Sequence, residues 1–245
     1  LVLNRKRTNY MRKFDAVVCA CAAQYHVLKK YINNVYIVPD LSYYHYKYEE
    51  KSVIKSDNVL KFVWDGQSVN FRQLKAFIEE NKSVFTNSDV SLYIITDEFM
   101  PGNNFNIRQY IETLSCNIHF VKCDEGTFID NVKKCDVGLA IVDMKCNNSL
   151  LKPENKLVNY VGLGLAAIAS NTMAYSAFAE NCPNSVIICN ANNDWIEAIE
   201  FMRANRDKLN KFGKQGREYV IENYSERKLI DSWISIISNL LTSKC

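Results

Sequence analysis

Short apolar runs rich in Val, Ile and Leu alternate with stretches of helical periodicity along most of this chain. The runs are apolar at every position rather than at every second one, which is typical of strands buried on both faces of a sheet. Buried strands separated by helices predict an α/β fold, a Rossmann-like, doubly wound parallel sheet. The predicted strands are 15–20, 34–39, 59–64, 90–96, 117–121, 137–142, 165–170 and 185–189.

Helical periodicity fills most of the intervals and then takes over after residue 193. Residues 40–58 interrupt the alternation, because they are polar, rich in Tyr and without any period, which indicates a linker. This break predicts two domains, a partial α/β unit over 1–55 and a complete Rossmann-like unit with C-terminal helices over 56–245. The predicted helices are 22–32, 69–85, 104–115, 125–134, 152–162, 193–210, 216–224 and 225–241, the last capped by Ser225.

Composition excludes several classes of protein. The net charge of +3 is too small to indicate a nucleic-acid partner. Nine cysteines without a CxxC pair and three scattered histidines favour reduced thiols over a zinc site or a disulfide framework, and therefore a cytoplasmic location. No apolar run approaches the ~18 residues of a membrane span.

The chain opens on LVLNRKRTNYMRKF, without an initiator Met or a signal peptide, which indicates either the middle of a longer polypeptide or a trimmed chain. The basic stretch over 4–13 has two interpretations. It is either a solvated helix face or a helix that touches anionic lipid.

Parallel sheets of this kind bind ligands at the carboxyl ends of their strands, so the loops after the predicted strands are the candidate sites. The first loop of the larger unit is WDGQSVNF, in which Gly66 allows a tight turn and Ser68 can cap the next helix. The loop lacks the GxGxxG pattern of dinucleotide-binding folds. Gly66 is therefore either a simple turn residue or a phosphate contact.

A lysine in the first turn of a helix marks the second candidate loop, KPENK. Pro153 and Glu154 suit a helix start, but the positive end of the helix dipole disfavours Lys156. Exposed backbone N–H groups together with a lysine form a phosphate site. Otherwise, Lys156 points to solvent or pairs with Glu154.

Three stretches in the same order resemble GT-B glycosyltransferases of the glycosyl transferases group 1 type. KPENKLVNYVGLGLAAIAS (152–170) is similar to the family pattern KPxNKLxEYxxxGLPVIAS. CDVGLAIVD (135–143) is similar to the family's strand before the donor loop. Residues 213–237 resemble the family's C-terminal helices. DAVVCACAAQYHVLKKYINNVYIVPDL looks like the last βαβ unit of the N-terminal domain. The resemblance implies the C-terminal half of a GT-B fold, joined to the end of the acceptor-side domain.

The resemblance also implies a donor site. Lys156 is then the catalytic residue that neutralises the donor pyrophosphate, at a helix that starts near Asn155. Asn159 holds the ribose, although the family has Glu there, and Leu151 stands where the family has a Glu that contacts the donor sugar. The implied donor-binding residues are Gly66 and Gln67 near the phosphates or sugar, Lys122 in the loop through Asp124 that holds the base, and Asn155, Lys156 and Asn159.

The implied function is transfer of a sugar from a nucleotide-sugar donor to a glycan or lipid-linked acceptor, retaining and without a metal or cofactor. This chain would be mainly the donor-binding part, at the inner face of the membrane if the missing N-terminal domain touches lipid. Leu151 and Asn159 leave open a catalytically inactive binding or scaffolding domain. A nucleotide-sugar epimerase would need more carboxylates and histidines around the cleft.

Overall fold

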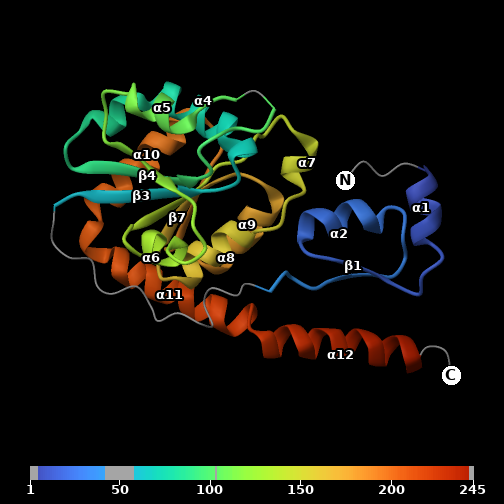
Figure 1. Ribbon diagram of the computed structural model, residues 1–245. Coiled ribbons are helices and arrows are strands. Elements are labelled where there is room, and N and C mark those ends of the chain that lie inside the picture. Colours follow the sequence, from blue (N-terminus) through green and yellow to red (C-terminus); the bar gives the residue numbers. More distant parts are fainter. Residues whose placement is uncertain (1–4, 42–57, 103, 243–245) are drawn as a thin grey trace.

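The computed structural model describes residues 5–41, 58–102 and 104–242. Its main element is a six-stranded, all-parallel sheet in the order β5-β4-β3-β6-β7-β8 (Figure 1). The predicted α/β, Rossmann-like fold is therefore confirmed. The strands are β3 (Leu60–Asp65), β4 (Val90–Thr96), β5 (Ile118–Lys122), β6 (Val137–Ala140), β7 (Ala166–Ser170) and β8 (Val186–Cys189).

Helices cover both faces of this sheet (Figure 1). One layer consists of α4 (Phe71–Asn81), α5 (Ile107–Glu112) and α10 (Asn192–Ala204). The other consists of α6 (Phe128–Lys133), α8 (Asn155–Gly162), α9 (Met173–Asn181) and α11 (Leu209–Asn223). The chain builds the sheet outward from β3 to β5, then returns to place β6 beside β3. The carboxyl ends of β3 and β6 therefore form the topological switch point, where folds of this kind bind ligands.

Alternation along the strands explains why their sequences are apolar at most positions. In β3, Phe62 and Trp64 pack into the core cluster beneath α4 and α10, whereas Val63 packs into the cluster around α8 and α9. In β4, Ile94 and Ile95 divide between the two clusters in the same way. Because successive side chains point to opposite faces, a sheet with two covered faces needs an apolar residue at every position.

A smaller unit precedes the main sheet and is called here the N-terminal unit (residues 5–41). It contains α1 (Arg5–Met11), β1 (Val17–Cys19), α2 (Ala22–Lys29) and β2 (Val35–Ile37), whose two strands form a separate parallel sheet. The last helix, α12 (Glu226–Thr242), runs from the main sheet back to this unit (Figure 1). There Leu229 and Ile236 pack against Val38. The linker predicted over 40–58 falls mostly on 42–57, outside the described residues.

All eight predicted strands are present, each within three residues of its predicted ends. The helices differ more. The predicted helix over 69–85 is α4 flanked by the 3-10 turns η1 (Ser68–Asn70) and η2 (Lys82–Thr86), so the N-cap residue of α4 is Asn70 and not Ser68. A third turn, η3 (Arg206–Lys208), separates α10 from α11. Ser225 caps the last helix as predicted, because its hydroxyl accepts the N–H of Lys228 at 3.3 Å.

Two helices, α7 (Asn147–Leu150) and α9, were not predicted from the sequence. Helix α9 has a clear start, because the Thr172 hydroxyl accepts the N–H of Tyr175 at 3.2 Å. Its sequence, MAYSAFAEN, mixes large and small, mostly apolar residues and has no charged residue before Glu180. This pattern gives no helical period to detect.

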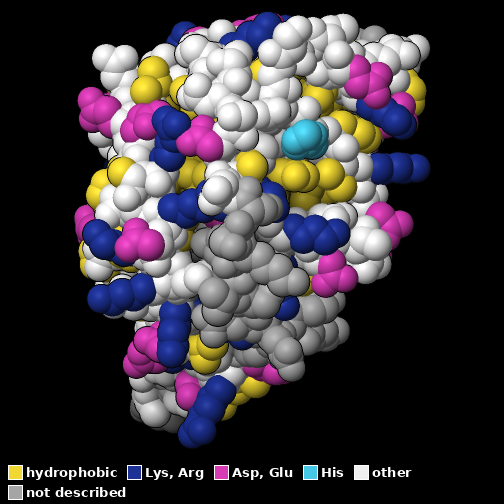
Figure 2. All heavy atoms as spheres, turned by 90° about the vertical axis from the view of Figure 1, so that its left-hand side faces the viewer, with side chains coloured by type: hydrophobic (Ala, Val, Ile, Leu, Met, Phe, Trp, Pro, Cys, Tyr) yellow, Lys and Arg dark blue, Asp and Glu magenta, His cyan; other side chains and the backbone are white. Residues whose placement is uncertain are grey.

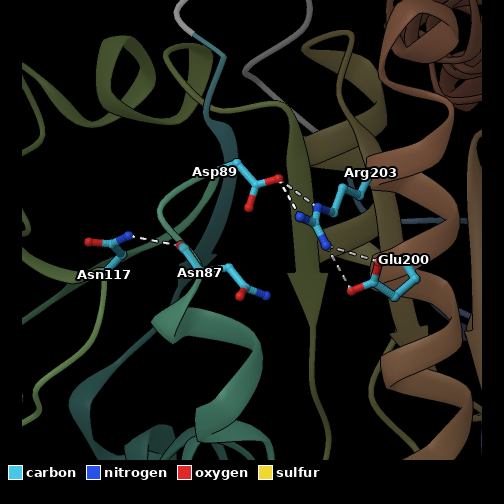
Figure 3. A network of polar contacts seen from close by, with 5 residues as sticks. All are labelled: Asn87, Asp89, Asn117, Glu200 and Arg203. Atoms are coloured by element: carbon cyan, nitrogen blue, oxygen red, sulfur yellow. Dashed lines mark hydrogen bonds and ion pairs between the residues drawn. The ribbon is translucent and has the colours of Figure 1, made fainter.

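Ionic contacts hold the end of the sheet at which the strands begin. Arg203 of α10 binds the Asp89 carboxylate just before β4 with a nitrogen–oxygen distance of 2.6 Å, and it also contacts Glu200 (Figure 3). The Arg203 and Asp89 side chains are 37% and 39% exposed, so this pair stabilises the fold by less than about 1 kcal/mol. Figure 2 shows this end of the molecule, where basic and acidic side chains are interspersed over the described surface.

Candidate functional site

Helix α8 holds the last residue of β3 by both of its backbone polar groups. The Asp65 N–H donates to the Tyr160 hydroxyl at 3.1 Å, and the Lys156 ammonium donates to the Asp65 carbonyl. Lys156 and Tyr160 are four residues apart, so both lie on one side of α8. A Cβ on Gly138 of β6 would lie 2.2 Å from the Tyr160 ring, so only glycine leaves room for this ring. The β3–β6 switch point is thus bridged by α8.

The loop after β3 is tied to its neighbour strand and lies close to Lys156. The Gly66 N–H donates to the Ile95 carbonyl at 3.2 Å, and the Thr96 hydroxyl donates to the Gly66 carbonyl at 2.6 Å. A Cβ on Gly66 would lie 2.9 Å from the Trp64 ring and 3.3 Å from the Lys156 nitrogen. Gly66 is therefore more than a turn residue, because its missing side chain lets the loop approach the lysine.

Lys156 is half-buried, and its ammonium lies 4.7 Å from the centroid of the Trp64 ring. Burial lowers the pKa of Lys156, the Asp65 carboxylate opposes that shift, and the ammonium of Lys152 adds to it. Neither of the simple alternatives for Lys156, exposure to solvent and pairing with Glu154, describes its position. It does not point freely into solvent, and Glu154 turns instead toward Tyr224, whose hydroxyl donates to it at 2.9 Å.

The side of α8 that other elements leave uncovered carries three of the predicted donor-binding residues. Asn155 is exposed and Lys156 and Asn159 are partly exposed, whereas residues 157, 158, 160 and 161 are buried. The Asn155 amide donates to the carboxylate of Asp40 at 2.8 Å, which links α8 to the N-terminal unit. Asn159 lies one turn further along the same side of the helix.

The other predicted residues lie further from Lys156. Gln67 is exposed next to Gly66, and its backbone carbonyl accepts the Asn70 N–H at 2.9 Å. Lys122 ends β5, the edge strand two places from β3, so strand spacing puts it about 10 Å along the sheet edge. The structure therefore brings Gly66 and Lys156 into contact, places Asn155 and Asn159 on the same helix as Lys156, and leaves Lys122 apart.

Four residues of this site were not identified from the sequence, namely Trp64, Asp65, Lys152 and Tyr160. The Lys152 ammonium donates to the Asn70 side chain at 3.3 Å and lies close enough to lower the pKa of Lys156. The spacing of the two lysines in KPENK, four residues apart, was a signal for their proximity. Trp64 and Tyr160 gave none, because each reads as an ordinary core aromatic.

Leu151 has a structural role at the position where the resembling family has a Glu. Its carbonyl accepts the side-chain N–H of Gln24 of α2 at 3.0 Å, and its side chain packs against the core around α8 and α9. Leu151 thus joins the N-terminal unit to the main sheet.

Within the described ranges, no group of three or more His, Cys, Asp or Glu side chains is arranged to hold a metal ion. The eight cysteines in these ranges are free thiols. None of the helices in this part of the chain combines the length and apolar character that crossing a membrane requires.

The all-parallel sheet, its switch-point site and the final helix that returns to a second α/β unit define one half of a GT-B fold. Solved glycosyltransferases share it. S. aureus TarM matches with a TM-score of 0.72 at 15% identity, over 95% of this chain and 46% of TarM. A glycosyltransferase from Rickettsia africae matches with a TM-score of 0.74 at 13% identity, over 98% of this chain and 68% of the Rickettsia protein. Anabaena HepE in complex with UDP matches with a TM-score of 0.75 at 10% identity, over 97% of this chain and 67% of HepE.

These likenesses establish that the chain has the fold of the GT-B glycosyltransferases. The chain spans about half the length of TarM. No protein-family model and no curated protein sequence matches it.

Proposed function

We propose that this chain is the donor-binding part of a glycosyltransferase and that it binds the pyrophosphate of a nucleotide sugar at the start of α8. The observation that carries the proposal is the convergence of two ammonium groups, Lys152 and Lys156, on the carboxyl end of β3. The hydrogen-bond partner of Lys156 in the described structure is a backbone carbonyl, not a carboxylate. The N–H groups at the start of α8 add to this positive potential.

Negative charge grows on the leaving pyrophosphate as its bond to the sugar breaks. An ammonium held in place before the reaction stabilises that charge at little reorganisation cost. The Trp64 ring beneath Lys156 and the Asp65 carbonyl fix its position. We infer that the two lysines and the helix supply the positive charge of this step, which supports transfer without a metal. The retaining outcome is carried over from the family resemblance.

The remaining assignments are carried over from the family resemblance. Asn159 takes the ribose, Gly66 and Gln67 approach the phosphates or the sugar, and the loop after Lys122 takes the base through its backbone. Anabaena HepE, solved with UDP and with UDP-glucose, supports a nucleotide-sugar donor.

Residues 1–55 represent the end of the acceptor-side domain in this proposal, and the acceptor is a glycan or a lipid-linked glycoconjugate. TarM was solved with fondaparinux and UDP, and WaaG is a glycosyltransferase of lipopolysaccharide biosynthesis, which supports a carbohydrate acceptor. We place this reaction in the cytoplasm, at the inner face of the membrane if the acceptor-side domain contacts lipid.

The packing of Leu151 favours a second function, a GT-B domain that binds or scaffolds without catalysis. A residue that is committed to the contact between the two units does not recognise a donor sugar. Sugar transfer by the full-length protein distinguishes the two functions, because the scaffold predicts none.

A binding comparison tests the pyrophosphate site directly. Lys156→Met keeps the alkyl stem over Trp64 and removes the charge, while Arg203→Met removes a cation at the opposite end of the sheet. With UDP and GDP as probes, calorimetry on Lys156→Met should show binding ten- to a hundredfold weaker, the loss of about 1.5–3 kcal/mol that one charged hydrogen bond contributes. Uridine and guanosine binding should barely change, and Arg203→Met should behave as wild type. Equal losses for nucleoside and nucleoside diphosphate would assign Lys156 to the scaffold.

A further inference from the structure

The N-terminal unit concentrates the positive charge of this chain. Residues 5–41 contain seven Lys and Arg and two Asp, a net charge of +5, whereas the whole chain carries only +3. The rest of the chain is therefore net negative. On the face of the main sheet in Figure 2, cations and anions are interspersed instead. A net charge gathered on one small unit indicates that this unit has a negatively charged partner.

Helix α1 is anchored on one side and presents the other side to the outside. Thr8 is buried, and Met11 packs against the core of the N-terminal unit. Lys6 and Tyr10 lie one turn apart on the side opposite Thr8, and both are exposed. The Phe14 ring, just after the helix, lies 5.2 Å from the Tyr10 ring between centroids. The exposed side of α1 therefore combines a cation with two aromatic rings.

The loops that precede β1 and β2 bring further cations and a third ring to the same place. Arg12 and Lys13 precede β1, Tyr31 precedes β2, and all three are exposed. The Arg12 Nε–H donates to the Tyr31 carbonyl at 3.0 Å, which joins the two loops. The surface formed in this way is called here the basic corner, and its residues are Lys6, Tyr10, Arg12, Lys13, Phe14 and Tyr31.

The aromatic rings of the basic corner distinguish between possible anionic partners. Tyr10, Phe14 and Tyr31 are 62%, 54% and 45% exposed. Aromatic side chains beside exposed Lys and Arg are typical of helices that bind at the surface of a membrane. Single-stranded nucleic acids instead stack successive bases on open ring faces. The Tyr10 and Phe14 rings meet edge to face at 75°, so they offer no pair of parallel faces. The exposed rings therefore favour lipid.

The position of the basic corner leaves the proposed donor site open. The corner lies at the amino ends of β1 and β2, and α1 is at the end of the N-terminal unit farthest from the main sheet (Figure 1). The chain after the carboxyl end of β1 contacts the main sheet, because the Gln24 amide donates to the Leu151 carbonyl at 3.0 Å. A large flat partner can therefore cover the corner without covering α8.

We propose that the basic corner binds the surface of an anionic lipid membrane. The ammonium and guanidinium groups of Lys6, Arg12 and Lys13 would lie near the lipid phosphates, with the three aromatic rings at the level of the headgroups. Each Lys or Arg near such a surface strengthens binding about fivefold. This proposal goes beyond the proposed function and does not depend on it, because the corner shares no residue with the donor site.

Cosedimentation with vesicles of phosphatidylcholine and phosphatidylglycerol tests the proposal, with vesicles of phosphatidylcholine alone for comparison. We expect binding to the mixed vesicles only, and weaker binding as the salt concentration rises from about 0.05 M to about 0.5 M. Lys6→Gln combined with Lys13→Gln should weaken binding about 25-fold. Lys211→Gln combined with Lys214→Gln, at two exposed lysines of α11, should leave it unchanged.

A second variant tests the rings apart from the charge. Tyr10→Ser combined with Phe14→Ser should weaken binding by a similar factor at every salt concentration, because the rings bury apolar area and neutralise no charge. Wild-type values of Tm and of UDP binding would show that each variant is folded. Phe14→Trp adds a direct measurement, since an indole that enters the headgroup region shifts its fluorescence emission to shorter wavelength.

Several results would overturn the proposal. These are a lack of binding to the mixed vesicles, equal binding to both kinds of vesicle, and full binding by the double lysine variant. Binding of a single-stranded RNA that is tighter than binding of the mixed vesicles, and that is lost in the same variant, would assign the corner to nucleic acid instead. None of these results bears on the pyrophosphate site, which the UDP titrations test separately.

Discussion

The ammonium of Lys156 lies 4.7 Å from the centre of the Trp64 ring while it donates a hydrogen bond to the carbonyl of Asp65, the next residue. The lysine therefore binds the end of β3 before any ligand arrives. The positive end of α8 disfavours a cation at this position by a few tenths of a kcal/mol or more. The ring and the carbonyl offset that cost and keep the ammonium at the ligand edge of the sheet. This relationship makes Lys156 a prepared anion-binding group.

The lowered pKa of Lys156 predicts how stability depends on pH. Because burial lowers the pKa in the folded protein, the unfolded chain holds the proton more tightly. Wild type should therefore gain stability relative to Lys156→Met as the pH rises from the lowered value toward 10.5, the ordinary value. Urea unfolding at about pH 7 and about pH 10 measures this difference. Lys214→Met, an exposed lysine of α11, should show no such change.

We predict that a substitution at Asn159 strengthens nucleotide binding. If it faces the ribose, Asn159→Glu should tighten UDP or GDP binding by about 1 kcal/mol, because a carboxylate makes stronger hydrogen bonds to the ribose hydroxyls than an amide does. The nucleoside should gain equally, since the contact does not involve phosphate. Asn159→Gln is the matched neutral control and should show no gain. Calorimetry that finds weaker or unchanged binding in the Glu variant would place Asn159 away from the ribose.

Gly213 predicts a large loss of stability from a small change. Alanine normally favours a helix over glycine by about 1 kcal/mol. In α11, however, a Cβ on Gly213 would lie 1.9 Å from the Gly164 carbonyl oxygen, a backbone atom with little freedom to move. Steric conflict should outweigh propensity, so Gly213→Ala should lose about 2 kcal/mol or more of unfolding free energy. Denaturant unfolding provides the measurement. Lys214→Ala in the same helix should change stability by less than about 0.5 kcal/mol.

We predict that the contribution of Glu154 to stability depends on pH in the opposite direction from that of Lys156. Burial raises its pKa in the folded state, so the folded protein holds the proton more tightly and loses stability as the pH rises from 4.5 through the raised value. Glu154→Gln should therefore have a higher Tm than wild type near neutral pH. The difference should vanish below about pH 4, where the carboxyl is protonated in both states. A lower Tm for the variant at neutral pH would show that the charge stabilises the fold.

Local patterns determined most of the secondary structure. The strand over 90–96 was predicted to the residue, because a run that is apolar at most positions on both faces favours the middle of a covered parallel sheet. Helix α9 could not be found in this way. Its buried residues, Ala174, Tyr175, Phe178 and Ala179, mix small and large side chains, so no regular stripe of large apolar residues marks its buried face, and its identity depends on packing against α2 and the main sheet.

The sequence by itself determined the fold class, the approximate strands, and the lysine motif at a helix start, because each depends on residues close together in the chain. Only the tertiary structure decided what Lys156 contacts. Asp65 lies 91 residues before it, and the two meet because the chain returns to place β6 beside β3. The pairing of Glu154 with Tyr224, 70 residues later, likewise exists only after α11 has packed against α8. A local pattern cannot specify such contacts, because they depend on how distant elements stack around a common sheet.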